Sequence, residues 1–249
     1  MMLVAPPVFF CIALVFSMLG MGGSQLYIPI LFWLGMDFKA EAIPLGLLLN
    51  VVNTSSAATT YIRNRLVNWR VALPFAVTMV LLPPLGAVVN AQLAVRPIIV
   101  LFALFTAAAA VLMLGGWRPK SGGLSRKGQI AVGTVGGGTL GFVVGLIGRG
   151  GGSFVVPLLY ICGLEAKAAA ATSAVVVTGS GLSGFLAHLP TATLHWGTTL
   201  ATAASVLLGS QVGSRLMAKK LKSRAVRVVF GVVLLGVATA LLIQGVLLH

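Results

Sequence analysis

The stretch Gly148-Arg149-Gly150-Gly151-Gly152-Ser153 separates two apolar segments in the second half of the chain. Each glycine in a helix interior costs about 1 kcal/mol relative to alanine, so four glycines in five residues break a helix. Non-helical backbone at membrane depth is tolerated only where it is buried in protein or lines a cavity. The arginine is a candidate functional residue, because charged side chains are costly inside a bilayer. The stretch therefore predicts a broken membrane helix beside a binding cavity.

The first half contains a weaker copy of this stretch. Gly20-Met21-Gly22-Gly23-Ser24 is followed by an apolar run that contains Pro29, as its counterpart is followed by Pro157. A pair of glycine-interrupted membrane segments in corresponding positions of two halves indicates the binding site of a secondary transporter. We therefore expect a small secondary transporter.

Composition places the chain in the class of all-α polytopic membrane proteins. Of its 249 residues 58% are hydrophobic and only 8% are charged, against about 25% charged in soluble domains. The net charge of +14 comes from short basic clusters between apolar runs, which the positive-inside rule explains without a nucleic-acid partner. The lipid bilayer is the expected surrounding. The three acidic residues, Asp37, Glu41 and Glu165, leave little material for a proton relay, and no metal or cofactor is expected.

The chain divides into a membrane repeat at 1–116, a basic linker at 117–127 and a second membrane repeat at 128–249. The apolar segments 25–36 and 154–163 are too short to span easily, so we expect short broken or re-entrant helices after the glycine-rich breaks. The N-terminal run lacks a basic leader and is expected to be a retained first span. The expected full spans are 3–21, 42–62, 71–91, 97–115, 129–147, 168–187, 196–214 and 228–247.

The two halves align at an offset of about 128 residues, with the glycine breaks shifted by one residue. The matching pairs include Pro29 and Pro157, Gly35 and Gly163, Lys39 and Lys167, Trp69 and Trp196, and Gly86 and Gly213. This many matches in order indicates a duplication of about five membrane segments.

Charge predicts the mutual orientation of the halves. If the basic segments 63–70 and 118–127 are cytoplasmic, counting spans puts the basic segment 215–227 in the cytoplasm as well. The uncharged segment 188–195 then lies outside, although it corresponds to 63–70 in the repeat. Equivalent loops on opposite sides mean an inverted-topology repeat. The linker is then cytoplasmic and both termini are extracytoplasmic, in a plasma or inner membrane.

The breaks predict an anion site. A short helix follows each break, so the free N–H groups and partial positive charge of its N-terminus face the break. Ser24 and Ser153 would each add a hydroxyl donor. The alternative is close helix packing through small residues, which we expect for the scattered glycines such as Gly133 and Gly141. Arg149 would supply a permanent cation to an oxyanion, or would extend to the membrane surface.

Polar clusters in the spans after the breaks complete the candidate site. Asn50 and Asn53 share a helix face, and their amides could donate to a desolvated oxyanion. The alternative role of such side chains is hydrogen bonding between helices. The candidate substrate-binding residues are Gly22, Gly23, Ser24, Gln25, Asn50, Asn53, Arg149, Gly150, Gly151, Gly152, Ser153, Thr172 and Ser173.

At these residues the chain resembles the TauE/SafE sulfite exporter family, which includes 4-toluene sulfonate uptake permeases. The resemblance rests on each glycine-rich break, the following Pro29 or Pro157, and then Gly35 or Gly163, and it covers essentially the whole chain. Ser24 replaces a third glycine in the first copy. The resemblance implies a permease for small sulfur-containing or organic anions such as sulfite, thiosulfate or sulfonates. The hypothesis for its mechanism is alternating access between the inverted halves, with the anion bound between the two breaks.

Three other functions are weighed against this hypothesis. An anion channel would use the same pore without alternation and would conduct faster, without saturation or counterflow. A transporter of another small anion or metabolite would share the architecture. A membrane-embedded enzyme would need a nucleophile, an acid–base pair or metal ligands at membrane depth, and the sequence offers no such set. Coupling to H⁺, coupling to Na⁺ through unwound carbonyls, and uniport are all compatible with the sequence.

Overall fold

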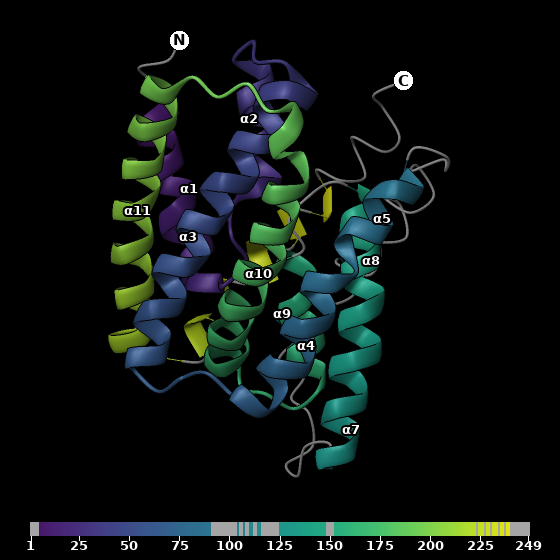
Figure 1. Cartoon of the computed structure of the whole chain (residues 1–249). Coiled ribbons are helices and arrows are strands. Elements are labelled where there is room, and N and C mark those ends of the chain that lie inside the picture. The colour runs from purple at the N-terminus through teal and green to yellow at the C-terminus, as the bar shows by residue number, and fades with distance from the viewer. Residues whose placement is uncertain are drawn as a thin grey trace.

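The computed structural model describes residues 5–90, 125–147 and 152–222, with scattered positions within 104–115 and 224–239. All regular structure in these parts is helical (Figure 1). Two stretches, Trp69–Gly86 and Ala166–His188, are long and apolar enough to cross a membrane. The predicted spans 97–115 and 228–247, most of the linker, and residues 148–151 of the second break lie largely or wholly outside the described residues.

In the first half, the chain runs from one end of the molecule to its middle and then reverses direction (Figure 1). Helix α1 (Ala5–Leu19) ends at the first break, and the ten-residue α2 (Ser24–Trp33) returns toward the end where α1 begins. A π-helical turn, η1 (Phe38–Ala42), then leads into α3 (Ile43–Arg63), which runs the full height. The prediction of a short helix after the first break is confirmed.

Two further helices complete the described part of the first half. Helix α4 (Trp69–Leu81) is followed directly by α5 (Pro83–Asn90). A single span over 71–91 was predicted. The stretch Trp69–Gly86 is long and apolar enough to cross a membrane, but an interruption at Leu82 divides it into α4 and α5. Pro83 has no N–H to continue the hydrogen-bond ladder, so the helix stops and restarts there.

The second half begins at the opposite end of the molecule. Helix α7 (Arg126–Ala131), the π-helical η2 (Val132–Gly136) and α8 (Gly137–Ile147) follow one another toward the middle. The ten-residue α9 (Gly152–Ile161) comes after the second break, as predicted, and α10 (Ala166–His188) then runs back across the molecule. A short 3₁₀ turn, η3 (Leu189–Thr191), leads to α11 (Trp196–Lys219).

Helices α2 and α9 begin 128 residues apart in the sequence, and each ends in the same type of turn. Gly35 (φ +92°) and Gly163 (φ +95°) occupy the left-handed conformation that closes a Schellman motif, where glycine avoids strain. The same hydrogen bonds close both turns: Leu34 N to Ile30 O, Gly35 N to Phe32 O and Met36 N to Leu31 O, and then Cys162 N to Leu158 O, Gly163 N to Tyr160 O and Leu164 N to Leu159 O. Ser24 therefore corresponds to Gly152, and the predicted one-residue shift at the breaks is wrong.

The described helices form two bundles that do not coincide with the two halves of the sequence (Figure 1). Helices α1, α2, α3 and α11 pack together as the first bundle, and α4, α5, α8, α9 and α10 as the second. The bundles share an extensive contact between α3 and α10, and one cluster of buried apolar side chains extends across both bundles. Helix α11 thus joins the bundle of the first half, while α4 and α5 join the bundle of the second.

Glycines allow the closest helix contacts within each bundle. A Cβ at Gly209 or Gly213 of α11 would overlap the backbone of α1, at Phe10 O and Leu14 O. In the second bundle, a Cβ at Gly141 of α8 would lie 3.1 Å from Thr78 O of α4. The packing role that we expected for Gly141 is confirmed.

Side-chain hydrogen bonds fasten α11 to α3 inside the first bundle. Ser210 Oγ donates to Asn53 O at 2.7 Å, and Gln211 Nε2 donates to Ser56 Oγ at 2.7 Å. One turn further, Ser214 Oγ lies 3.1 Å from Thr60 Oγ1.

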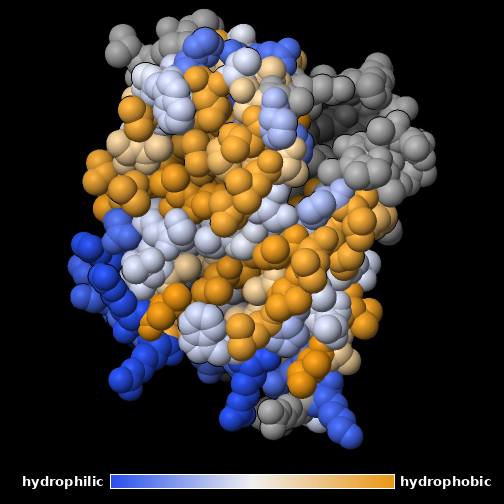
Figure 2. Space-filling view, viewed as in Figure 1, coloured by the Kyte–Doolittle hydropathy of each residue, from blue (hydrophilic) through white to orange (hydrophobic). Residues whose placement is uncertain are grey.

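The surface is apolar around the middle and hydrophilic at the ends (Figure 2). The exposed apolar side chains include Leu73, Val77 and Leu81 of α4 and Leu200 and Leu208 of α11. Basic side chains gather at the lower end, where α3 and α11 end and α4 and α7 begin. This pattern fits a helical bundle surrounded by lipid.

Candidate functional site

The first break holds its backbone in a conformation that only glycine adopts readily. Gly20 (φ +66°) and Gly22 (φ +67°) both lie in the left-handed region. A Cβ at Gly20 would overlap the carbonyl oxygen of Ala170, and a Cβ at Gly22 would overlap Asn50 Oδ1. The glycines therefore let α10 and the Asn50 side chain approach the broken backbone directly.

Two segments of the second half close on the first break. A Cβ at Gly152, the first residue of α9, would overlap the carbonyl oxygen of Met21. Ser173 of α10 donates its hydroxyl hydrogen to Gly20 O at 2.9 Å. The start of α9 and the middle of α10 thus contact the break that precedes α2.

Asn50 of α3 caps the N-terminus of α2. Its Oδ1 accepts hydrogen bonds from Gly23 N at 3.0 Å and Ser24 N at 3.3 Å. Because both partners are donors, the amide oxygen must face them, and this fixes the direction of Nδ2. Nδ2 lies 2.9 Å from the position that a Cβ of Gly181 would occupy, so it faces α10.

Two donors beside this cap are buried without a partner among the described residues. They are Asn50 Nδ2 and the Ser24 hydroxyl, on side chains 0% and 1% exposed. An unpaired buried donor costs about 1–3 kcal/mol. The arrangement is therefore suited to a ligand that accepts hydrogen bonds.

Tyr27 and Asn53 form the next layer of the site. A Cβ at Gly23 would overlap the Tyr27 ring, so the ring covers the start of α2. The Tyr27 hydroxyl lies 3.2 Å from Asn53 Nδ2, while Asn53 Oδ1 has no partner within the described part of the chain. The ring of Phe9 lies 5.1 Å from that of Tyr27, centroid to centroid.

The structure brings together most of the predicted site residues that it describes. Gly22, Gly23, Ser24, Asn50, Asn53, Gly152 and Ser173 gather at the first break, and Gln25 lies in the first turn of α2. Thr172 contacts the loop before α4 instead, where its Oγ1 accepts from Asn68 N at 3.0 Å. Ser153 follows Gly152 in the first turn of α9. Arg149, Gly150 and Gly151 lie outside the described residues.

Sequence reasoning missed Tyr27 and Gly181. Tyr27 lies in an apolar run, where its ring is expected to be part of the hydrophobic core. A buried tyrosine hydroxyl nevertheless needs a polar partner, and this requirement could have identified Tyr27 as a residue near the site. Gly181 lies 128 residues after Asn53, so the repeat alignment itself pairs it with a candidate site residue.

The acidic residues lie away from the break. Asp37 and Glu41 belong to the segment that joins α2 to α3, and Glu165 is the N-cap residue of α10. Around the first break the described helix ends contribute partial charges of both signs: positive at the starts of α2 and α9, and negative at the end of α1.

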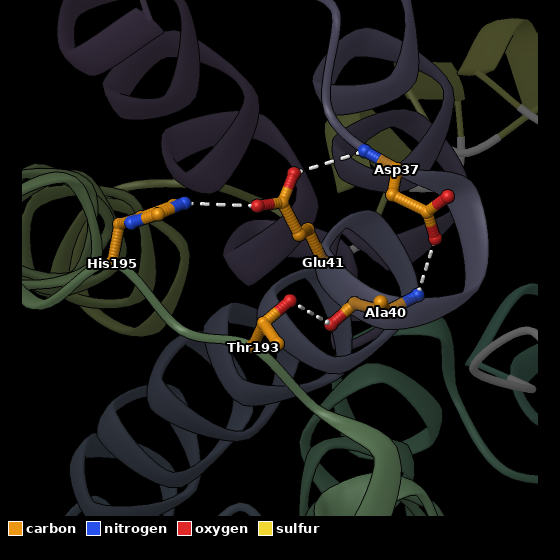
Figure 3. Close-up of polar contacts among 5 residues, drawn as sticks. All are labelled: Asp37, Ala40, Glu41, Thr193 and His195. Atoms are coloured by element: carbon orange, nitrogen blue, oxygen red, sulfur yellow. Dashed lines mark hydrogen bonds and ion pairs between the residues drawn. The ribbon is translucent and has the colours of Figure 1, made fainter.

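At the other end of α2, a polar cluster joins the start of α3 to the start of α11 (Figure 3). His195 Nε2 lies 2.9 Å from Glu41 Oε1, and Thr193 N donates to Ala40 O at 2.8 Å. Glu41 Oε2 accepts from Asp37 N at 2.9 Å. Because His195 is exposed, its contact with Glu41 contributes at most about 1 kcal/mol.

These features define a helical membrane protein with a polar, glycine-lined site at a helix break. The family model of the sulfite exporter TauE/SafE matches residues 6–241, so the chain belongs to this family. A relative from Bacillus subtilis (strain 168), described as "probable membrane transporter protein YunE", is 23% identical over 255 residues, covering 92% of this chain and 93% of the relative. No solved structure matches the chain significantly. The protein is thus a membrane transporter.

Replacing Gly152 with alanine tests the contact between α9 and the first break. The added methyl group would overlap Met21 O, so we expect Gly152→Ala to lower stability by about 1–3 kcal/mol. The measurement is the melting temperature of the purified protein in detergent. Gly197→Ala is the matched control, because a Cβ there meets nothing within 4 Å. Equal melting temperatures for the Gly152→Ala variant and the wild type would contradict the contact.

Proposed function

We propose that the protein transports a small anion that binds at the start of α2. The observation that carries this proposal is the pair of buried, unpartnered donors, Asn50 Nδ2 and Ser24 Oγ, beside a helix N-terminus. A bound oxyanion accepts hydrogen bonds from both groups and so removes the cost of burying them unpaired. The dipole of α2 adds a favourable field for negative charge.

Sulfur-containing or organic anions such as sulfite, thiosulfate and sulfonates are the proposed substrates. The family description, which names sulfite, supports this choice. We also assign Arg149 to the site, because it corresponds to Met21 of the first break, and Met21 O touches the start of α9. A guanidinium at that position would add forked donors to the same oxyanion.

An inverted repeat is the proposed basis of transport. Three observations support it. Helices α2 and α9 end in the same type of turn, and α1 and α8 approach the middle from opposite ends. The helix contacts in one bundle also match those in the other. Thus α1 packs on α11 as α8 packs on α4 and α5, and α3 packs on α11 as α10 packs on α4. We place the basic lower end in the cytoplasm and segment 188–195 outside, in a plasma or inner membrane.

The two bundles, and not the two sequence halves, are the proposed moving bodies. Asn50 comes from the first bundle, whereas Ser173, Gly181 and Gly152 come from the second, so the site lies between them. Within the described ranges the chain crosses between bundles at 64–68 and 189–195. Rocking of the bundles about the α3–α10 contact would open the site to each side in turn.

A channel would use the same donors without this motion. Saturation and counterflow of a labelled anion in liposomes separate the two, because only a carrier exchanges bound substrate across the membrane. Coupling to H⁺ or Na⁺ is tested by imposing each gradient in the same assay. Stimulation by one gradient identifies the coupled ion, and insensitivity to both indicates uniport.

Asn50→Asp is the sharpest single test of the site. The carboxylate keeps an acceptor for Gly23 N and Ser24 N, so the cap and the fold should survive. It removes the Nδ2 donors and adds negative charge, so we expect counterflow of radiolabelled thiosulfate to fall about tenfold or more. Asn68→Asp, at the N-cap of α4, is the matched control and should transport normally. Normal thiosulfate transport by Asn50→Asp would place the anion elsewhere.

Engineered cysteine pairs test which parts move. In a Cys11→Ala, Cys162→Ala background, Thr60→Cys with Ser214→Cys joins the sequence halves inside the first bundle, where the hydroxyls are 3.1 Å apart. Leu47→Cys with Gly184→Cys joins the two bundles, where a Cβ at Gly184 lies 3.7 Å from the Leu47 methyl groups. After oxidation, thiosulfate counterflow should persist in the first variant and stop in the second.

Reduction provides the internal control for both cysteine variants. It should restore transport by the variant that joins the bundles. If oxidation of the Thr60 and Ser214 cysteine pair blocks transport reversibly, the two sequence halves move relative to each other. The proposal that the two bundles are the moving bodies is then wrong.

A further inference from the structure

We propose that Lys167 is a gate residue of transport. Its hydrogen bond to the end of α11 holds the two bundles together on the basic side of the site, and this bond must break before the site opens to that side. The inference rests on the proposed function, because it needs the two bundles to move relative to each other. It follows from the position of this bond along α10.

The side chain of Lys167 extends from one bundle to the other. Lys167 lies in the first turn of α10, in the second bundle, and its Nζ donates to Ala218 O at 3.1 Å. Ala218 is the last residue but one of α11, which packs in the first bundle. The lysine side chain is only partly exposed, so water and salt screen this bond less than a bond at the open surface.

The end of α11 is a favourable partner for a lysine. The last four carbonyl groups of a helix have no partner within the helix, and the C-terminal end carries a partial negative charge. A lysine ammonium supplies both a donor and a positive charge to such an end. Here the ammonium comes from the other bundle, so the bond that caps α11 also joins the bundles.

The bond lies between the anion site and the basic end of the molecule. Lys167 comes six residues before Ser173, whose hydroxyl bonds to the backbone of the first break. At 1.5 Å per residue, the two residues are about 9 Å apart along α10, with Lys167 toward the lower end in Figure 1. Leu164, just before α10, and Met217, in the last turn of α11, belong to one cluster of buried apolar side chains. Apolar packing and the lysine together close the basic side.

Further along α10, the contacts with the first bundle involve small residues. A Cβ at Gly181 would lie 2.9 Å from Asn50 Nδ2, and a Cβ at Gly184 would lie 3.7 Å from the Leu47 methyl groups. Such contacts can shift gradually, whereas a separation of a few ångströms removes a hydrogen bond entirely. Lys167 therefore favours the arrangement of the bundles that is closed on the basic side.

Distances between spin labels test the gate without any substrate. In a Cys11→Ala, Cys162→Ala background, labels at Arg63→Cys and Lys127→Cys mark the basic ends of the two bundles. Both positions are exposed, the first at the end of α3 and the second in α7, which packs on α4. Lys167→Met removes the charge and the donor but keeps a long apolar side chain. Pulsed electron–electron double resonance should show the population with wider separation rising about fivefold or more over the labelled wild type.

Two variants control for charge and for folding. Lys219→Met removes a charge from the exposed last residue of α11 and should leave the distances unchanged. Lys167→Arg keeps a charged donor and should keep the bundles close. An unchanged distance distribution in a folded Lys167→Met protein would overturn the proposal. A shift of equal size in Lys219→Met would also overturn it, because net charge would then explain the effect.

A reversible bridge tests whether transport needs the bond to break. In the same background, Lys167→Cys and Ala218→Cys are joined by a short bis-methanethiosulfonate reagent that replaces the lysine side chain. Thiosulfate counterflow should stop in the bridged protein and return on reduction, while each single-cysteine variant treated with the reagent continues to transport. Normal counterflow in the bridged protein would overturn the gate. Absence of counterflow in the wild type would instead contradict the proposed function, and the spin-label distances would still decide whether Lys167 holds the bundles together.

Discussion

The hydrogen bonds from Gly23 N and Ser24 N to Asn50 Oδ1 are the interaction on which the rest of the site depends. A helix that stops at membrane depth exposes backbone groups that lipid cannot satisfy, so protein must supply their partners. Here α3 supplies the acceptor through Asn50, and α10 supplies a donor to Gly20 O through Ser173. Because these two helices belong to different bundles, the backbone of the break is satisfied only where the bundles meet. Under the proposed mechanism, an anion that binds there biases the arrangement of the bundles, because its contacts differ between their positions.

The sequence predicted those structural features that depend on residues close together in the chain. The glycine-rich breaks predicted two short helices, and both α2 and α9 are ten residues long. The position of the interruption at Pro83 was not predicted: this proline lies inside the stretch that is long enough to span a membrane and divides it into α4 and α5. The packing of α11 against helices of the first half could not be predicted, because an apolar face indicates that a helix packs but not which helix it packs against. The inverted orientation of the repeat remains a prediction that the corresponding contacts of the two bundles support.

For the candidate site as well, the sequence indicated which residues are polar but not the direction in which each side chain points. The sequence predicted Asn50 and Ser173 as candidates that line a cavity, with hydrogen bonding between helices as the alternative. In the structure both side chains bond to the backbone of the first break. Thr172 lies one residue from Ser173 and therefore points to a different face of α10, toward the start of α4. The role of Tyr27 was hidden by its apolar neighbours, and its position over Gly23 follows from the backward tilt of helical side chains. Such directions are set by helix packing and cannot be read from composition.

The central claim is that an oxyanion occupies the space beside Asn50 and Ser24. Crystallographic location of selenate, a fully deprotonated anomalous scatterer, in protein made without selenomethionine tests it most directly. The account predicts an anomalous selenium peak at the start of α2, with selenate oxygens within hydrogen-bond distance of Asn50 Nδ2 and Ser24 Oγ. A well-occupied selenate elsewhere in the membrane region, with both donors still unpaired, would contradict it.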